Sequence, residues 1–187
     1  SQSIAIGYRA GSETATNSNN NIFLGTCAGR YSRGHNNVYI GRCANAAGTN
    51  YGSSSVIIGA WAGSCNGSGE NTYVGGGAGY YSKGQFNTLL GYYAGGRACG
   101  SYCSTWVGAY SGCGTGTEAN YTGDCNVGMG NRAGRGMTSG HSVVMIGNEA
   151  GCKNSSGSQN VYLGQRAAYH GETGSCNVAI GNSVFLP

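Results

Sequence analysis

A five-residue phrase, clearest as Asn37-Val38-Tyr39-Ile40-Gly41, recurs from one end of the chain to the other. Eleven copies can be counted, with 16 to 22 residues between the closing glycines of consecutive copies. Those glycines are Gly7, Gly25, Gly41, Gly59, Gly75, Gly91, Gly108, Gly130, Gly147, Gly164 and Gly181. A fixed period with self-similar content is the signature of a repeat architecture, so each copy is expected to form one structural unit of a stack.

The two positions that flank the centre of the phrase are β-branched or aliphatic in every copy. Residues two apart share one face of a strand, and β-branched residues suit a pleated surface. We therefore expect a short strand in each copy, with this flanking pair facing a core and the glycine ending the strand. The clearest of these core positions are Ile22, Leu24, Gly25, Val38, Ile40, Gly41, Val161, Leu163 and Gly164.

The glycine is followed three residues later by a small residue, usually Ala, which predicts a second short strand with a small inward side chain. A polar loop then leads to the next copy, so the unit is a coil of about 17 residues that must stack to bury its apolar face. The predicted fold is an all-β parallel β-solenoid of eleven coils, a rod roughly 50 Å long. Residues 1–187 are expected to form one domain, with a protruding loop at 112–125, where the glycine spacing is longest.

Composition excludes several other classes of protein. Glycine accounts for 38 of 187 residues without a Gly-X-Y period, which excludes collagen, and the single proline, Pro187, suits a ladder that needs its N–H groups. Charged residues make up 9% of the chain and form no polybasic tract, so no nucleic-acid partner is expected. No apolar run reaches 18 residues, so no membrane-spanning helix is expected.

The centre of each phrase should point away from the core pair, yet it is apolar in most copies. An exposed apolar stripe usually marks an interface, which predicts self-association, most simply as a trimer around the stripe. The alternative is that aromatic residues simply suit strands and keep their polar tips in water. The predicted stripe consists of Phe23, Tyr39, Ile57, Tyr73, Leu89, Trp106, Met145 and Tyr162.

Asparagine opens seven of the phrases and serine opens three. Stacked Asn side chains can bond to one another and to turn backbone, so a ladder is expected along the rod. Its members are Asn21, Asn37, Asn71, Asn87, Asn126, Asn160 and Asn177.

Nine cysteines are many for a chain of this length and suggest an oxidising, extracellular compartment. Cys27 and Cys43 occupy the same position in successive coils, as do Cys103 and Cys125, so both pairs are candidate disulfides. The alternative is that the cysteines fill alanine-like slots as small buried residues.

The chemistry-bearing residues are scattered. The histidines His35, His141 and His170 and the six acids fall at unrelated repeat positions, so no catalytic residue, metal site or cofactor is expected. A hexapeptide-type acyltransferase is disfavoured because each coil carries one aliphatic-Gly phrase rather than three. Ice binding would need a regular outward array of small residues, and the column Tyr8, Thr26, Arg42, Ala60 is heterogeneous.

The phrases Ser3-Ile4-Ala5-Ile6-Gly7 and Asn177-Val178-Ala179-Ile180-Gly181 resemble the head repeats of trimeric autotransporter adhesins. The segments 21–29 and 87–95, with the Ser/Gly loops that follow them, resemble repeats of bacteriophage tail fibres. The resemblance implies a left-handed, trimeric parallel β-roll on a virion or cell surface, used for attachment to a receptor or glycan. The period near 17 and the cysteine content depart from the usual adhesin head.

The sequence therefore predicts a non-enzymatic, extracellular structural protein that associates with itself into a trimeric attachment fibre. The alternative is a subunit that polymerises head to tail into a disulfide-stabilised filament. That alternative depends on Ser1 to Gly11 and the apolar segment 182–187, which carry no polar cap and would leave the strand edges open. The apolar segment could instead fold over the open end as a cap.

Overall fold

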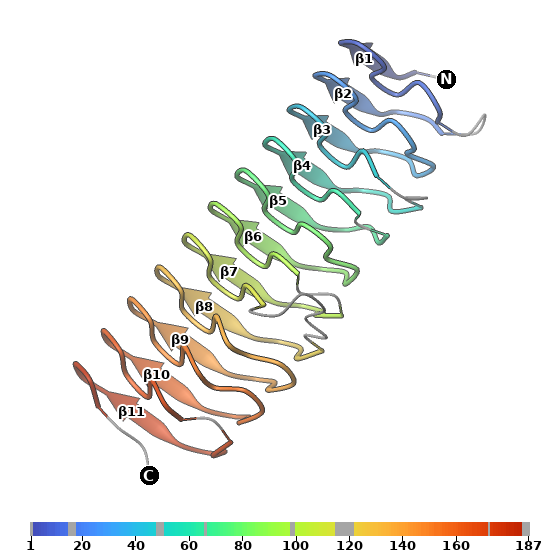
Figure 1. The fold of residues 1–187 in the computed structure, drawn as a ribbon. Coiled ribbons are helices and arrows are strands. Elements are labelled where there is room, and N and C mark those ends of the chain that lie inside the picture. The colour runs from blue at the N-terminus through green and yellow to red at the C-terminus, as the bar shows by residue number, and fades with distance from the viewer. Residues whose placement is uncertain are drawn as a thin grey trace.

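The structure is a computed structural model. It describes residues 2–14, 18–47, 51–65, 67–97, 100–114, 122–171 and 173–184. These residues contain eleven short strands and no helix, and Figure 1 shows the coils stacked in chain order. The strands are β1 (Ile4–Ile6), β2 (Ile22–Leu24), β3 (Val38–Ile40), β4 (Val56–Ile58), β5 (Thr72–Val74), β6 (Thr88–Leu90), β7 (Thr105–Val107), β8 (Val127–Met129), β9 (Val144–Ile146), β10 (Val161–Leu163) and β11 (Val178–Ile180).

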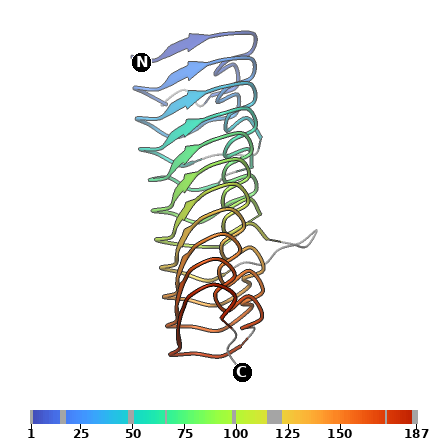
Figure 2. The same ribbon diagram turned by 90° about the vertical axis from the view of Figure 1, so that its left-hand side faces the viewer.

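The eleven strands form one parallel sheet in chain order, and each strand pairs with the next without a register shift. Leu24 lies opposite Ile40, for example, so equivalent repeat positions are stacked along the rod. Figure 2 shows the same stack from the side, with one strand in each coil. The predicted parallel β-solenoid with a period near 17 is confirmed. The predicted protruding loop at 112–125 lies largely outside the described residues.

The glycine that closes each phrase is required for two reasons. All eleven have φ between 123° and 137°, a conformation that residues with a side chain rarely adopt. A Cβ built on Gly41 would also lie 2.7 Å from the carbonyl group of Gly59 in the next coil. The backbones of neighbouring coils therefore meet too closely at this corner for any side chain.

The second short strand predicted after each glycine is not present; the chain forms a tight turn there. In the second coil, Ala28 N donates to Gly25 O at 3.1 Å, and Cys27 adopts the left-handed conformation with φ 58°. The ladder between coils nevertheless continues, because Gly29 N donates to Ala44 O of the next coil at 2.9 Å. The small residue of this turn points inward as predicted: Ala28, Ala44 and Ala62 are fully buried.

The core is built from the centre of each phrase, which reverses the predicted orientation of the strands. The residues expected to form an exposed stripe are all at most 2% exposed: Phe23, Tyr39, Ile57, Tyr73, Leu89, Trp106, Met145 and Tyr162. The aliphatic residues expected to face the core are half-buried or exposed on the outer side of the sheet: Ile22, Leu24, Val38, Ile40, Val161 and Leu163. The predicted interface at the stripe, and a trimer axis along it, are therefore wrong.

The reason for the reversal lies one residue before each strand. Asn37 is fully buried, and because side chains alternate along an extended segment, Tyr39 must share its inward face. A buried amide group needs hydrogen-bond partners, and turn carbonyls supply them inside the coil. Val38 and Ile40 have no polar group that needs such a partner, so they can lie on the outer side of the sheet. Aromatic rings from the strands and alanines from the turns then fill the interior together.

Candidate interaction surfaces

The outer side of the sheet is the first candidate. We call it the outer sheet face: the first and third residues of each of the eleven strands. All of them are aliphatic, methionine or threonine, and none is charged. In the middle of the rod Val56 is 37%, Leu90 47% and Ile146 39% exposed. Isolated apolar side chains are normal on a surface, but these two columns form an uncharged strip along the rod that is apolar except at Thr72, Thr88 and Thr105.

Inside the coils, the asparagine positions form a ladder of hydrogen bonds to backbone groups. Asn37 N donates to Asn21 Oδ1 at 2.9 Å, and Ser55 N donates in turn to Asn37 Oδ1 at 3.0 Å. Each amide also reaches a turn carbonyl, as Asn37 Nδ2 does at Gly52 O, 3.0 Å away. The same pattern continues through Asn71, Asn87, Asn126 and Asn160, and at the end of the ladder Asn177 N donates to Asn160 Oδ1. The ladder ties consecutive coils together and is internal, so it is not a site for an external ligand.

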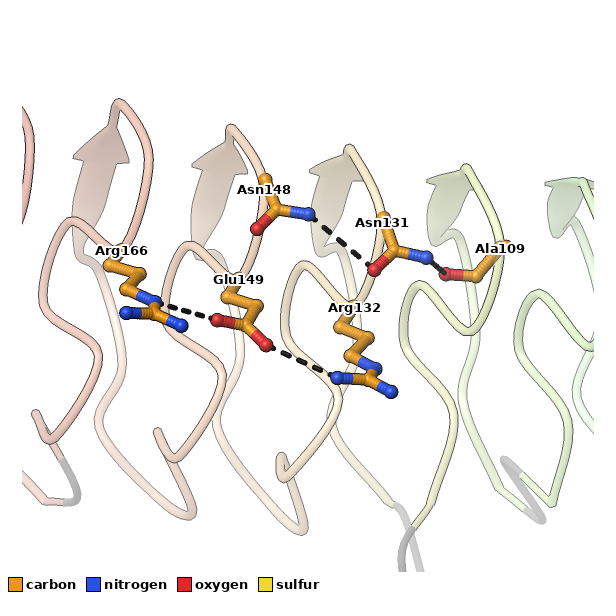
Figure 3. A network of polar contacts seen from close by, with 6 residues as sticks. All are labelled: Ala109, Asn131, Arg132, Asn148, Glu149 and Arg166. Atoms are coloured by element: carbon orange, nitrogen blue, oxygen red, sulfur yellow. Dashed lines mark hydrogen bonds and ion pairs between the residues drawn. The ribbon is translucent and has the colours of Figure 1, made fainter.

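The corner after each strand carries a second, exposed ladder (Figure 3). Glu149 lies between Arg132 and Arg166 from the neighbouring coils, at 3.3 Å and 2.8 Å. One residue earlier in the same corners, Asn148 Nδ2 donates to Asn131 Oδ1, and Asn131 Nδ2 donates to Ala109 O. This network was not predicted from the sequence. Its signal was that the second residues after successive glycines are Arg132, Glu149 and Arg166, an alternation of charge at the repeat period.

The hydrogen bond from Arg166 is the largest cause that lowers the pKa of the Glu149 carboxyl below its ordinary value. A further hydrogen bond from Arg132 acts in the same direction, and partial desolvation opposes them. Only 12% of the Glu149 side chain is exposed, whereas the side chains of Arg132 and Arg166 are 45% and 56% exposed, so the carboxylate lies in the surface beneath the two guanidinium groups. Its arrangement joins three coils and is consistent with a structural role.

Both candidate cysteine pairs lie at left-handed corners of adjacent coils. Cys27 and Cys43 have φ of 58° and 56°, and Cys103 and Cys125 have φ of 54° and 58°. Burial raises the pKa of the Cys43 thiol, and the neighbouring Cys27 raises it further. The pKa of Cys125 is raised by burial and by the charge of Cys103. All eight cysteines in the described part of the chain are free thiols, so the two predicted disulfides are not formed in this structure.

The histidines remain dispersed. His35 accepts a hydrogen bond from Asn19 N at 3.2 Å, whereas His141 and His170 are exposed in distant coils. Within the described ranges, no three His, Cys, Asp or Glu side chains come together as a possible metal site. No helix in the same part of the chain could span a membrane.

Comparison of the chain with protein-family models, with curated proteins and with solved structures found no match. The likeness to adhesin heads and tail fibres therefore remains a resemblance between repeats. The structure supports it at the level of the β-solenoid fold.

Proposed function

We propose that this protein is a non-enzymatic structural fibre that associates with itself through the outer sheet face, as a homotrimer of parallel rods. The observation that carries the proposal is the uncharged and mostly apolar outer surface of the eleven-stranded sheet. It replaces the aromatic stripe, which is buried inside each rod, as the surface for self-association.

The size of the outer sheet face fits a small interface. A rod of roughly 50 Å with an apolar strip about 10 Å wide presents on the order of 500 Å². A contiguous apolar patch of this size is at the upper end of what monomeric proteins expose, and three copies together would bury about 1,500 Å², or about 500 Å² in each of the three pairwise contacts, which is the size of a weak interface.

The two columns of this face favour three copies. When three rods meet at one axis, each rod contacts two neighbours, so one column can pack against each neighbour. The equal coil spacing in every copy lets the columns interlock along the whole rod, because repeat positions are in register throughout.

The resemblance to adhesin heads and tail fibres favours an extracellular place, on a cell surface or virion, and a role in attachment. A head-to-tail filament is the alternative assembly. It would join rods through the ends of the sheet, so it would leave the outer sheet face exposed.

Light scattering on paired variants tests this proposal. The substitutions Val56→Asp and Ile146→Asp place two carboxylates on the outer sheet face. The control substitutions Ser54→Asp and Ser142→Asp place the same charge on exposed residues of the same two coils. We expect the native chain and the control to have three times the 18.9 kDa chain mass, and the first variant to be monomeric. A monomeric native chain, or a trimeric first variant, would contradict the proposal.

Ice binding is a second candidate, favoured by the regularity of the outer sheet face. The first residue of every strand is β-branched, and Thr72, Thr88 and Thr105 follow one another at the centre of the rod. The heterogeneous column Tyr8, Thr26, Arg42, Ala60 follows the strands and is not part of this face. Thermal hysteresis of the native chain that Thr88→Lys abolishes would favour this function over self-association.

A further inference from the structure

Five tyrosines gather on the surface where the turns after β5, β6 and β7 lie side by side. Tyr93 and Tyr110 stack with ring centroids 6.0 Å apart, and Tyr92 meets both rings edge-on at 4.8 Å and 5.5 Å. Tyr80 contacts Tyr93 at 6.2 Å and Tyr81 at 4.5 Å. We call these five residues the tyrosine cluster.

Two glycines in the preceding turn make room for these rings. A Cβ on Gly77 would lie 2.9–3.0 Å from three atoms of the Tyr93 ring, so Tyr93 lies directly over the glycine. A Cβ on Gly76 would be in ordinary contact with Tyr92, at 3.4 Å and 3.6 Å. Gly76 and Gly77 therefore form a surface beside Tyr92 that carries no side chain, which we call the floor of the cluster.

The cluster is accessible although its members pack on one another. Tyr92 is 54% and Tyr81 43% exposed, whereas Tyr80, Tyr93 and Tyr110 are half-buried beneath them. The inner rings thus hold the outer rings in place, which lowers the entropy that a ligand would have to remove on binding. Exposed, preorganised aromatic rings with polar tips are a recurrent feature of binding surfaces.

The charge around the cluster is positive. The turns 75–81, 91–97 and 108–114 contain Arg97 and no acidic residue. At one end the Arg135 guanidinium lies 5.9 Å from the centre of the Tyr110 ring. The backbone N of Arg97 donates to the backbone O of Tyr80, so the Arg97 backbone lies next to that of Tyr80. An anionic ligand would be favoured here.

We propose that the tyrosine cluster binds a linear acidic polysaccharide. The C–H groups of a sugar ring would pack on the negative face of Tyr92 and of Tyr81. Tyrosine hydroxyls would bond to sugar hydroxyls, and Arg97 and Arg135 would pair with the carboxylates. The inference rests on the attachment role proposed above and names the class of its ligand. The site lies on the turns, so it does not require the outer sheet face to be free.

Single-stranded nucleic acid is disfavoured as the occupant. Grooves for such strands carry cations that follow the phosphate backbone, with aromatic rings between them. Here Arg97 and Arg135 belong to coils two apart, and the turn of the coil between them, 108–114, carries Tyr110 and no cation. The cluster therefore lacks the row of cations that such grooves place along the phosphate backbone.

The test is affinity electrophoresis of the full chain through gels that contain polygalacturonate, hydroxyethylcellulose or no polymer. We expect polygalacturonate to retard the native chain, and the double substitution Tyr81→Ala and Tyr92→Ala to weaken binding at least 10-fold. Tyr8→Ala is the matched control, because Tyr8 is 68% exposed and occupies the same repeat position as Tyr92. A second variant, Gly76→Gln, keeps every tyrosine but covers the floor, and it should also weaken binding.

Three results would overturn this inference: no retardation by polygalacturonate, equal retardation by the neutral polymer, or unchanged binding by both site variants. Binding of an oligo(dT) probe with loss in the same variants would instead assign the cluster to nucleic acid. Two controls separate this test from the test of self-association. Light scattering reports the oligomeric state of each sample, and the electrophoresis is repeated with the Val56→Asp, Ile146→Asp variant, which is expected to be monomeric. The monomer should still bind.

Discussion

Trp106 lies directly opposite Gly128 in the sheet, and its indole ring fills the space that a side chain at position 128 would occupy. Both residues are the centres of their phrases, so the largest and the smallest inward residues are neighbours. Gly112 and Gly134 border the same ring from the turns. The large side chain of one coil is thus matched by the absence of a side chain in the next coil, as close packing of a thin core requires.

This pairing predicts a strong coupling between two substitutions. Gly128→Val should cost about 1–3 kcal/mol by overpacking, and Trp106→Ala about 3–5 kcal/mol through the cavity it leaves. The double variant should lose about 1–3 kcal/mol less unfolding free energy than the sum of the two single losses, because the valine enters the cavity. Ala5→Val, at the exposed centre of β1, should be nearly neutral. Additive losses in chemical denaturation would show that the two side chains do not share a core.

The buried amide ladder yields a second prediction, at Asn37. Asn37→Ala would leave the Ser55 amide and the Gly52 carbonyl without their bonds, at a cost of about 2–4 kcal/mol. Asn37→Ser should cost less, since Ser55 Oγ accepts the Asn71 amide at 3.2 Å in an equivalent position. Hydrogen exchange at the Ser55 amide reports this bond directly. The ladder has no role in stability if Asn37→Ala leaves both the exchange rate and the unfolding midpoint unchanged.

The repeat period was sufficient to predict the solenoid, its parallel sheet and its strands. The glycine at the end of Val38–Ile40 and the inward alanine at position 44 follow from steric limits that act within one coil and its neighbour. These features depend on local backbone geometry, which the sequence expresses at every repeat.

The direction in which each strand faces could not be decided from apolarity, because both sides of the strand are apolar. Val38 and Ile40 look more like core residues than Tyr39 does when each position is considered alone. The deciding residue was Asn37, whose amide must be satisfied inside the coil and which fixes the face of Tyr39. The pairing of Trp106 with Gly128 was a second signal that the centre of the phrase faces inward. A large residue beside a very small one is needed where space is limited in a core, but not on a surface in contact with water.

The tyrosine cluster and the Glu149 network depend on how side chains of successive turns meet. The turn after each glycine was predicted as a strand, and a strand would have sent Tyr92 and Tyr93 to opposite faces. The left-handed residue in that turn, Tyr93 with φ 52°, brings both rings together on the surface instead.

The lowered pKa of Glu149 predicts a dependence of stability on pH. A carboxyl group whose pKa is lower in the folded chain stabilises the fold above its unfolded pKa, and this contribution is lost as pH falls through the folded pKa. Glu149→Gln should therefore lower the thermal midpoint by about 1–3 °C at pH 7 and have no effect near pH 2. Salt at 1 M should reduce the difference by screening. Glu70→Gln, outside this network, is the control, and a difference that persists at low pH would exclude the ion pairs as its source.

Oxidation should join Cys27 to Cys43 and Cys103 to Cys125, because each pair is held at the same corner of adjacent coils. Oxidised glutathione would accept the two electrons of each new bond, and each disulfide should remove two hydrogens from the chain mass. Closing a loop of about 15 residues stabilises a fold by about 3 kcal/mol, so the thermal midpoint should rise.

Since the pKa values of Cys43 and Cys125 are raised, less thiolate is present at neutral pH, and oxidation should accelerate as pH increases. Cys27→Ser should abolish one of the two mass changes, whereas Cys65→Ser should leave both. Peptide mapping that finds Cys27 bonded to another chain instead would assign this cysteine to contacts between rods.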